Sequence, residues 1–150
     1  MSEPRRNEIR TQIVDQTGID EAMIEHLVHR FYDRIRDDGV LGPIFTAHIT
    51  DWEPHLRTMC DFWSSVALMT GRYHGNPMGK HAHLPVDARH FNRWLELFEH
   101  TAQTVCPPAA AAHFVERARR IAESLELGIS VGHGQILAKG QRFINDDLNI

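Results

Sequence analysis

EAMIEHLVHRFYDRIRDD, residues 21–38, has the apolar spacing of an amphipathic helix. Its apolar side chains recur at intervals of three and four residues and so share one helical face: Ile24, Leu27, Val28, Phe31 and Ile35. Asp20 precedes the segment, where a carboxylate can accept hydrogen bonds from the first free backbone N–H groups of a helix. The segment predicts a helix that buries one face in a core.

Three more helices are expected farther along the chain, over about residues 52–69, 87–106 and 109–127. Thr50 and Glu53 have the spacing of a capping box at the start of the first of these, and Pro107-Pro108 separates the other two. No run of residues alternates between apolar and polar, as a half-buried strand would. The sequence therefore predicts an all-α fold.

Outside these helices the sequence predicts little regular structure. Residues 1–17 lack a clean period and are expected to form a frayed lead-in. Gly39, followed by Gly42-Pro43, predicts a turn after the first helix. Residues 128–150 form a tail that is either a disordered extension or a contact for another subunit. The length of 150 residues fits a single domain, residues 1–150.

Composition excludes several classes of protein. The net charge is −4 with neutral histidine and the pI is about 6.2, so the chain lacks the basic stripe of a nucleic-acid-binding protein. No window approaches the roughly 18 apolar residues of a membrane span. The polar start MSEPRRNEIR is unlike a secretory signal. We therefore expect a cytoplasmic protein with no nucleic-acid or membrane partner.

GRYHGNPMGKHAHLP, residues 71–85, carries three histidines in a long connection broken by glycine and proline. Long connections between strong helices are more often functional than not. One interpretation is a bare metal ion held by His81 and His83 with His74 or His90, since such sites need three or four converging ligands. The sequence contains neither HExxH nor paired ExxH motifs, so this remains a minor alternative.

Three polar aromatic groups, Tyr32, His55 and Trp94, occur on otherwise apolar helical faces. Each alone has a simpler structural explanation: a partly exposed or satisfied core histidine, a tyrosine hydrogen-bonded to the backbone, and a tryptophan packed in the core. Together they describe an apolar pocket with a phenol, an imidazole and an indole, which a histidine from residues 71–85 could enter from the other side. That arrangement suits a flat apolar cofactor with an axial metal, such as haem.

Three stretches then carry a family resemblance: RFYDRIRDDGVLGPIF (30–45), WEPHLRTMCDFWSSVALMTGRYHGNPMGKHAHLP (52–85) and HFNRWLELFEHT (90–101). Over about residues 20–105 the chain resembles the group III truncated haemoglobins. The resemblance implies a shortened globin fold, a two-over-two helical sandwich around a non-covalently bound haem b. It also implies a short, loop-like proximal segment, which matches the broken stretch 71–84.

The resemblance further implies a role for each candidate site residue. His81, in the pattern GxPxxxHxxLP, would be the proximal iron ligand, and its second ring nitrogen is expected to bind a backbone carbonyl or a carboxylate. Tyr32, His55 and Trp94 would be the distal groups that hydrogen-bond the iron's gas ligand, although His55 could instead swing outward as a gate or reach a haem propionate. The other cofactor-binding residues would be Phe45, Met59, Phe62 and Trp63. By proximity alone, the candidates for binding the haem propionates are Arg57, Arg72, Lys80 and His83.

The function implied by the resemblance is reversible binding of O2 and other diatomic gases, NO and CO, at the haem iron. An alternative is a haem enzyme, either an NO dioxygenase or a peroxidase-like protein. Because the sequence contains no flavin or nicotinamide module, such an enzyme would need a separate reductase as a partner. A third hypothesis is a haem-free metal protein or a structural helical protein. The sequence leaves the oligomeric state open.

Overall fold

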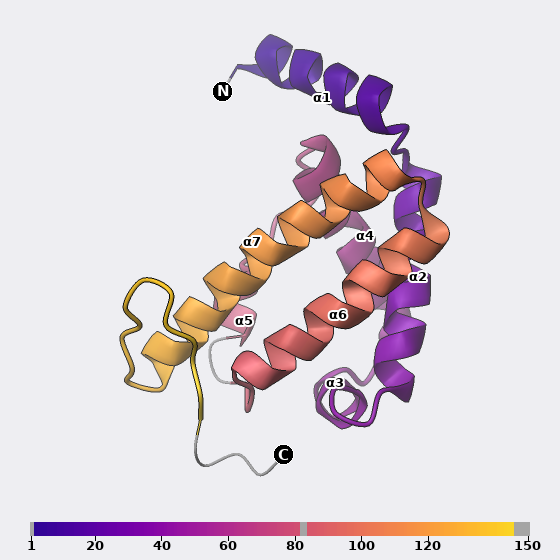
Figure 1. The fold of residues 1–150 in the computed structure, drawn as a ribbon. Helices are drawn as coiled ribbons and strands as arrows, with labels where there is room; N and C mark the ends of the chain where they lie inside the picture. Colours follow the sequence, from indigo (N-terminus) through magenta and orange to yellow (C-terminus); the bar gives the residue numbers. More distant parts are fainter. Residues whose placement is uncertain (1, 82–83, 146–150) are drawn as a thin grey trace.

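The computed structural model describes residues 2–81 and 84–145, and in this part of the chain it contains seven α-helices and no strand (Figure 1). The helices are α1 (Glu3–Thr17), α2 (Glu21–Asp37), α3 (Gly42–His48), α4 (Trp52–Leu68), α5 (Pro77–His81), α6 (Ala88–Val105) and α7 (Pro108–Gly132). The predicted all-α fold is confirmed. None of the described helices is both long enough and apolar enough to cross a membrane.

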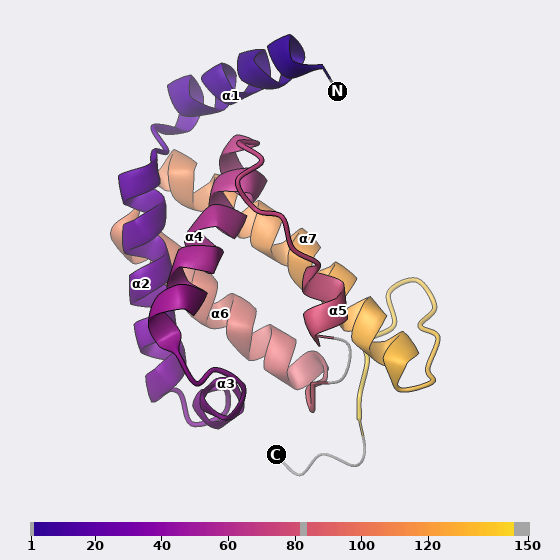
Figure 2. The same ribbon diagram turned by 180° about the vertical axis from the view of Figure 1, so that it is seen from behind.

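The four long helices of the core form two layers. Helices α6 and α7 pack side by side in one layer, and α2 and α4 pack against each other in the second (Figures 1 and 2). Contacts of α2 with α6 and of α4 with α7 join the layers, which gives the expected two-over-two arrangement. The aromatic side chains of Phe31, Phe98 and Phe114 are fully buried between them.

Helix α2 follows the prediction closely. Asp20 is its N-cap, and its side chain accepts a hydrogen bond from the backbone N–H of Met23 at 2.8 Å. All residues of the predicted apolar face are buried. At α4, the predicted capping box of Thr50 and Glu53 is wrong, because Asp51 is the N-cap and makes no side-chain capping bond. Thr50 therefore lies one residue outside the capping position.

Residues 3–17 form the helix α1, so the prediction of a frayed lead-in is wrong. The Ser2 side chain accepts a hydrogen bond from the backbone N–H of Arg5, and Gly18, with a left-handed φ of 72°, ends the helix. None of its residues is buried, because α1 lies across one end of the bundle (Figures 1 and 2). A helix with no buried face needs no apolar period, which explains why the pattern missed it.

The predicted turn at Gly42-Pro43 is instead the start of helix α3. Proline is tolerated there because the first turn of a helix leaves its N–H groups unpaired. Gly42 approaches the end of α2 closely: a Cβ atom at this position would lie 2.8 Å from the carbonyl oxygen of Arg36. Only glycine fits at this junction without a shift of the backbone.

The C-terminal tail is ordered as far as the structure describes it. Helix α7 begins at Pro108 and continues to Gly132, beyond the predicted end near Leu127. The following segment folds back so that Phe143 is fully buried, and the backbone N–H of Ala88 donates to the Phe143 carbonyl at 2.7 Å. For residues 128–145, the expected disordered extension is therefore wrong. Residues 146–150 lie outside the described part.

Candidate functional site

The helices enclose a cavity of about 420 Å³ with a mainly apolar lining. Its volume lies in the range of roughly 300–1,000 Å³ that is usual for ligand and cofactor pockets. All of the candidate site residues line it, although they come from helices α2 to α6: Tyr32, Phe45, His55, Met59, Phe62, Trp63, His81 and Trp94. The structure thus brings together in one cavity the residues that the sequence singled out.

His81 lies at the end of the short helix α5, which packs against α7 (Figure 2). The Asn76 side chain accepts a hydrogen bond from the backbone N–H of Gly79 in the first turn of this helix, and Pro77 opens it. His81 Nδ1 lies 2.5 Å from the backbone carbonyl oxygen of Pro77. A carbonyl only accepts, so Nδ1 carries the proton and Nε2 carries the lone pair. The predicted backbone partner of His81 is therefore Pro77.

His90 also lines the cavity, but its ring has the opposite tautomer. Its Nδ1 accepts a hydrogen bond from the backbone N–H of Asp87 at 3.0 Å, which completes a capping box at the start of α6. Nε2 must then carry the proton. Burial lowers the pKa of His90, although the nearby Asp87 carboxylate opposes this, so the ring is neutral near pH 7. His90 is a donor and not a metal ligand, which contradicts its place in the bare-ion interpretation.

Tyr32 provides a protonated hydroxyl at the cavity. Its side chain is only 6% exposed, and its ring packs edge to face against His55, with ring centroids 5.2 Å apart. Burial raises the pKa of Tyr32 well above its ordinary value, and the nearby Cys60 raises it further. Within the described residues, no protein group forms a hydrogen bond with its hydroxyl. The phenol is thus a neutral donor available to a bound molecule.

Trp94 is held by stacked aromatic rings. It stacks on Phe98 at a centroid distance of 5.5 Å, and Trp63 stacks on the same ring at 4.9 Å. Phe31 meets both Trp94 and Phe98 edge-on, at 5.4 and 5.1 Å. The indole N–H is a donor only. Helix α6 therefore places a rigid second donor on the cavity wall.

Trp52, which the sequence interpretation did not select as a site residue, packs edge-on against two residues of the cavity wall, Tyr32 and His55. Its ring lies 6.1 Å from that of Tyr32 and 5.9 Å from that of His55. The guanidinium of Arg36 lies 4.2 Å from the centroid of the Trp52 ring, in the geometry of a cation–π contact. The signal in the sequence was the spacing WxxH, since one helical turn separates Trp52 from His55.

Of the residues proposed for the haem propionates, the two that the structure describes fully are not at the cavity. Arg72 pairs with Glu21 at 3.5 Å, and neither Arg72 nor Arg57 lines the cavity. His83 and the side chain of Lys80 lie outside the described residues. In the part of the chain that the structure describes, no three histidine, cysteine or acidic side chains converge as a metal site would require, which leaves the bare-ion interpretation without support there.

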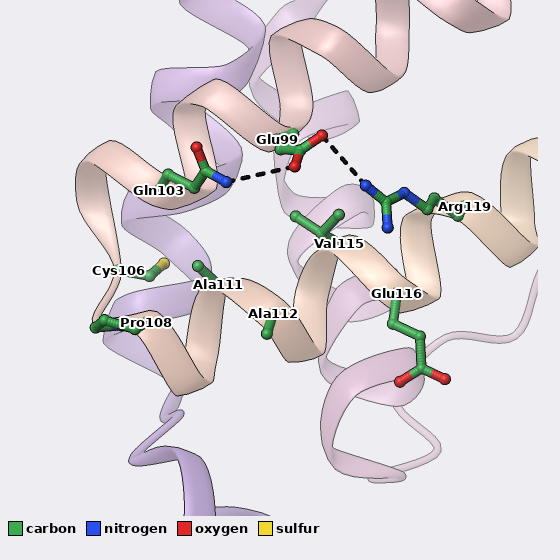
Figure 3. Close-up of a pocket in the computed structure, with 9 residues that line it drawn as sticks. All are labelled: Glu99, Gln103, Cys106, Pro108, Ala111, Ala112, Val115, Glu116 and Arg119. Carbon is green, nitrogen blue, oxygen red and sulfur yellow. Dashed lines mark hydrogen bonds and ion pairs between the residues drawn. The ribbon is translucent and has the colours of Figure 1, made fainter.

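A second hollow, of about 410 Å³, lies between the C-terminal half of α6 and the N-terminal half of α7 (Figure 3). Its rim is polar, because Glu99 accepts hydrogen bonds from Gln103 at 3.4 Å and from Arg119 at 3.3 Å. The thiol of Cys106 faces it, and burial raises the pKa of that thiol to about 11. None of the candidate site residues lies there, so the cavity in the bundle is the candidate site.

Comparisons with known proteins agree with this site. The model of the family described as bacterial-like globin matches residues 12–126. The chain is 33% identical over 113 residues to the group 3 truncated hemoglobin of Campylobacter jejuni subsp. jejuni, an alignment that covers 72% of this chain and 89% of that protein. The crystal structure of the group III truncated hemoglobin from Campylobacter jejuni matches with a TM-score of 0.67 and 33% identity, over 72% of this chain and 89% of the other.

Proposed function

Since the chain belongs to the group III truncated haemoglobins and is a haem-binding globin, we propose that it holds haem b in the cavity and there binds O2 and other diatomic gases reversibly. The donor set of the cavity fits this group. A flat apolar ring needs an apolar enclosure, and the iron needs one neutral imidazole nitrogen with a free lone pair. The apolar lining supplies the first, and Nε2 of His81 supplies the second.

The hydrogen bond between His81 and Pro77 carries this proposal. It fixes the tautomer in which Nε2 is free to bind the iron, and it fixes the orientation of the ring. His90, which also lines the cavity, presents a proton at Nε2 instead. The tautomer therefore excludes His90 as a ligand of the iron, whereas His48, whose Nδ1 also meets a backbone carbonyl, shares the tautomer of His81 and serves below as the control.

When bound, haem would supply an iron that binds a diatomic gas, and His81 would hold that iron. Tyr32 and Trp94, on α2 and α6, hold neutral O–H and N–H donors for the gas. A hydrogen bond to a charged group is worth roughly 1.5–3 kcal/mol, which corresponds to roughly ten- to hundredfold slower dissociation. Because bound O2 carries more negative charge than CO, these donors should retain O2 preferentially.

The axial ligand is tested by replacing His81 with alanine and recording absorption spectra after addition of haem. The wild-type protein is expected to give the five-coordinate ferrous spectrum of a histidine-ligated haem. H81A should lose this spectrum, and free imidazole should restore it. H48A is the matched control, because His48 also lines the cavity and also pairs Nδ1 with a backbone carbonyl, that of Ile44 at 2.8 Å. An unchanged spectrum in H81A would contradict the proposal.

The donors are tested by measuring O2 and CO dissociation from Y32F and W94F. Each is expected to release O2 roughly tenfold faster or more, with a smaller effect on CO. Y73F is the control, since Tyr73 is the other tyrosine of the chain and also lines the cavity, where it packs edge-on against Phe62. If Y32F and W94F release O2 no faster than Y73F, the donor assignment is wrong.

A further inference from the structure

Residues 135–145, here called the C-terminal clasp, lie outside the range 12–126 that matches the family. They return from the end of α7 to the start of α6 (Figure 1). Three anchors attach the clasp to the bundle, one each at Arg142, Phe143 and Asn145.

The first anchor is a buried carboxylate. Glu126 on α7 is only 5% exposed. Its carboxylate accepts hydrogen bonds from Arg142 Nη2 at 2.6 Å and from Arg142 Nε at 2.8 Å. The backbone N–H of Phe143 donates to the same carboxylate at 3.1 Å. A buried charge with this many charge-assisted hydrogen bonds fixes the geometry of its partners.

The second anchor joins the clasp to the N-terminus of α6. Asp87 is fully buried and accepts a hydrogen bond from the backbone N–H of Asn145 at 3.0 Å. The same carboxylate accepts the backbone N–H of Arg89, while the backbone N–H of Asp87 holds the ring of His90. The clasp thus contacts the residue that sets the tautomer of a cavity-wall histidine.

The third anchor is the Phe143 side chain, which is fully buried in a small core with Val86 and Ile129. Leu84 and Phe91 pack against this core. Val86, Ile129, Leu84 and Phe91 all line the cavity. Phe143 itself does not line it, so its ring supports the wall from behind.

Leu84 links this core to the proposed axial ligand. Its backbone N–H donates to the carbonyl of His81 at 3.1 Å, and the N–H of Val86 donates to the carbonyl of Leu84 at 2.9 Å. The small core that contains Phe143 is therefore connected to His81 through the packing of Leu84 and one backbone hydrogen bond.

We propose that the C-terminal clasp positions His81 in the cavity, with Phe143 as the positioning residue. This rests on the proposed function, in which His81 ligates the haem iron. Removing the Phe143 ring should release Leu84 and Val86, loosen the backbone at His81 and change the orientation of its imidazole. The two donors on the opposite side, Tyr32 and Trp94, are held by other contacts and should keep their positions.

The test compares F143A with I24A, which removes a fully buried side chain of α2 that does not line the cavity. In wild type and both variants, resonance Raman spectroscopy records the iron–histidine stretching band of the ferrous protein. Hydrogen–deuterium exchange is followed at the amides of Leu84 and Val86 without haem. F143A should shift or broaden the band and speed exchange by about tenfold or more, beyond the effect in I24A. If F143A does not fold, F143L provides the same comparison.

The two readouts separate this proposal from the proposed function. If the wild type gives no iron–histidine band, the haem ligation is wrong, and the exchange experiment still decides whether the clasp holds Leu84 and Val86. If the wild-type band is present but F143A matches I24A in both band and exchange, the clasp proposal is overturned while the proposed function stands.

Discussion

Replacing Asp87 by asparagine removes the negative charge that holds the clasp to the start of α6. The free energy of unfolding then measures what this charge contributes. Hydrogen bonds from Arg89 and Asn145 outweigh the effect of burial, which alone would raise the pKa, and lower the pKa of Asp87 from 3.8 to about 2. The folded state thus favours the ionised form. One pKa unit corresponds to about 1.4 kcal/mol, so the charge contributes at most about 2 kcal/mol to the free energy of unfolding at pH 7.

The sign of the pH dependence follows from the lowered pKa. The contribution is complete above about pH 5, where the unfolded carboxyl is also ionised, and it disappears as the pH falls through 3.8 towards 2. By pH 3 about half of it should be lost. The free energy of unfolding of D87N should therefore lie about 2 kcal/mol below that of wild type at pH 7 and about 1 kcal/mol below it at pH 3.

Urea denaturation of both proteins at pH 7, 5, 4 and 3 measures this difference. The control is D33N, which neutralises a carboxylate with 60% side-chain exposure and should change the free energy of unfolding by about 0.5 kcal/mol or less. A difference between wild type and D87N that is equal at all four pH values would refute the reasoning, since the loss would then come from packing and not from ionisation.

Three further outcomes are expected. G42A should lower the free energy of unfolding by about 1–3 kcal/mol in thermal or urea unfolding, because its Cβ would lie 2.8 Å from the backbone oxygen of Arg36; unchanged stability would contradict the close contact. In a spectrophotometric pH titration of the native protein, Tyr32 should ionise only above the ordinary range of a phenol, because burial raises its pKa; the same titration on Y32F, in which this signal should be absent, assigns it. H90Q, which can keep both the cap and an inward N–H donor, should be more stable than H90L by about 1 kcal/mol in urea; equal stabilities would argue against the capping box.

The long core helices could be predicted because their burial is periodic. In α2, α4 and α6 one face meets the core, so apolar residues recur every three or four positions. Asp20 and Asp87 in addition cap the starts of α2 and α6. Helix α1 has no buried face, and α3 is only seven residues long, so neither leaves such a period. Helix α1 depends on its local caps, Ser2 and Gly18. Helix α3 begins where Gly42 closely approaches the backbone of Arg36.

The candidate site was predictable as a set of residue types, and its finer chemistry was not. Tyr32, His55 and Trp94 stood out as polar groups on apolar faces, and the structure brings them into one cavity. The roles of the histidine nitrogens depend on which backbone group each ring meets, and single-sequence patterns do not encode that. Phe143 was missed because one aromatic residue in a polar segment has no period, and its burial depends on contacts with distant Val86.

The capping box at the start of α6 also makes the cavity selective between its own imidazoles. For His90 to bind a metal through Nε2, its proton would have to move to Nδ1, where it would point at the amide N–H of Asp87 at a distance of 3.0 Å. Two buried N–H groups that face each other, each without its acceptor, cost free energy. His90 could therefore bind a metal only if the first turn of α6 opened. The helix cap thereby protects the cavity from a competing coordination mode that its histidine content would otherwise invite.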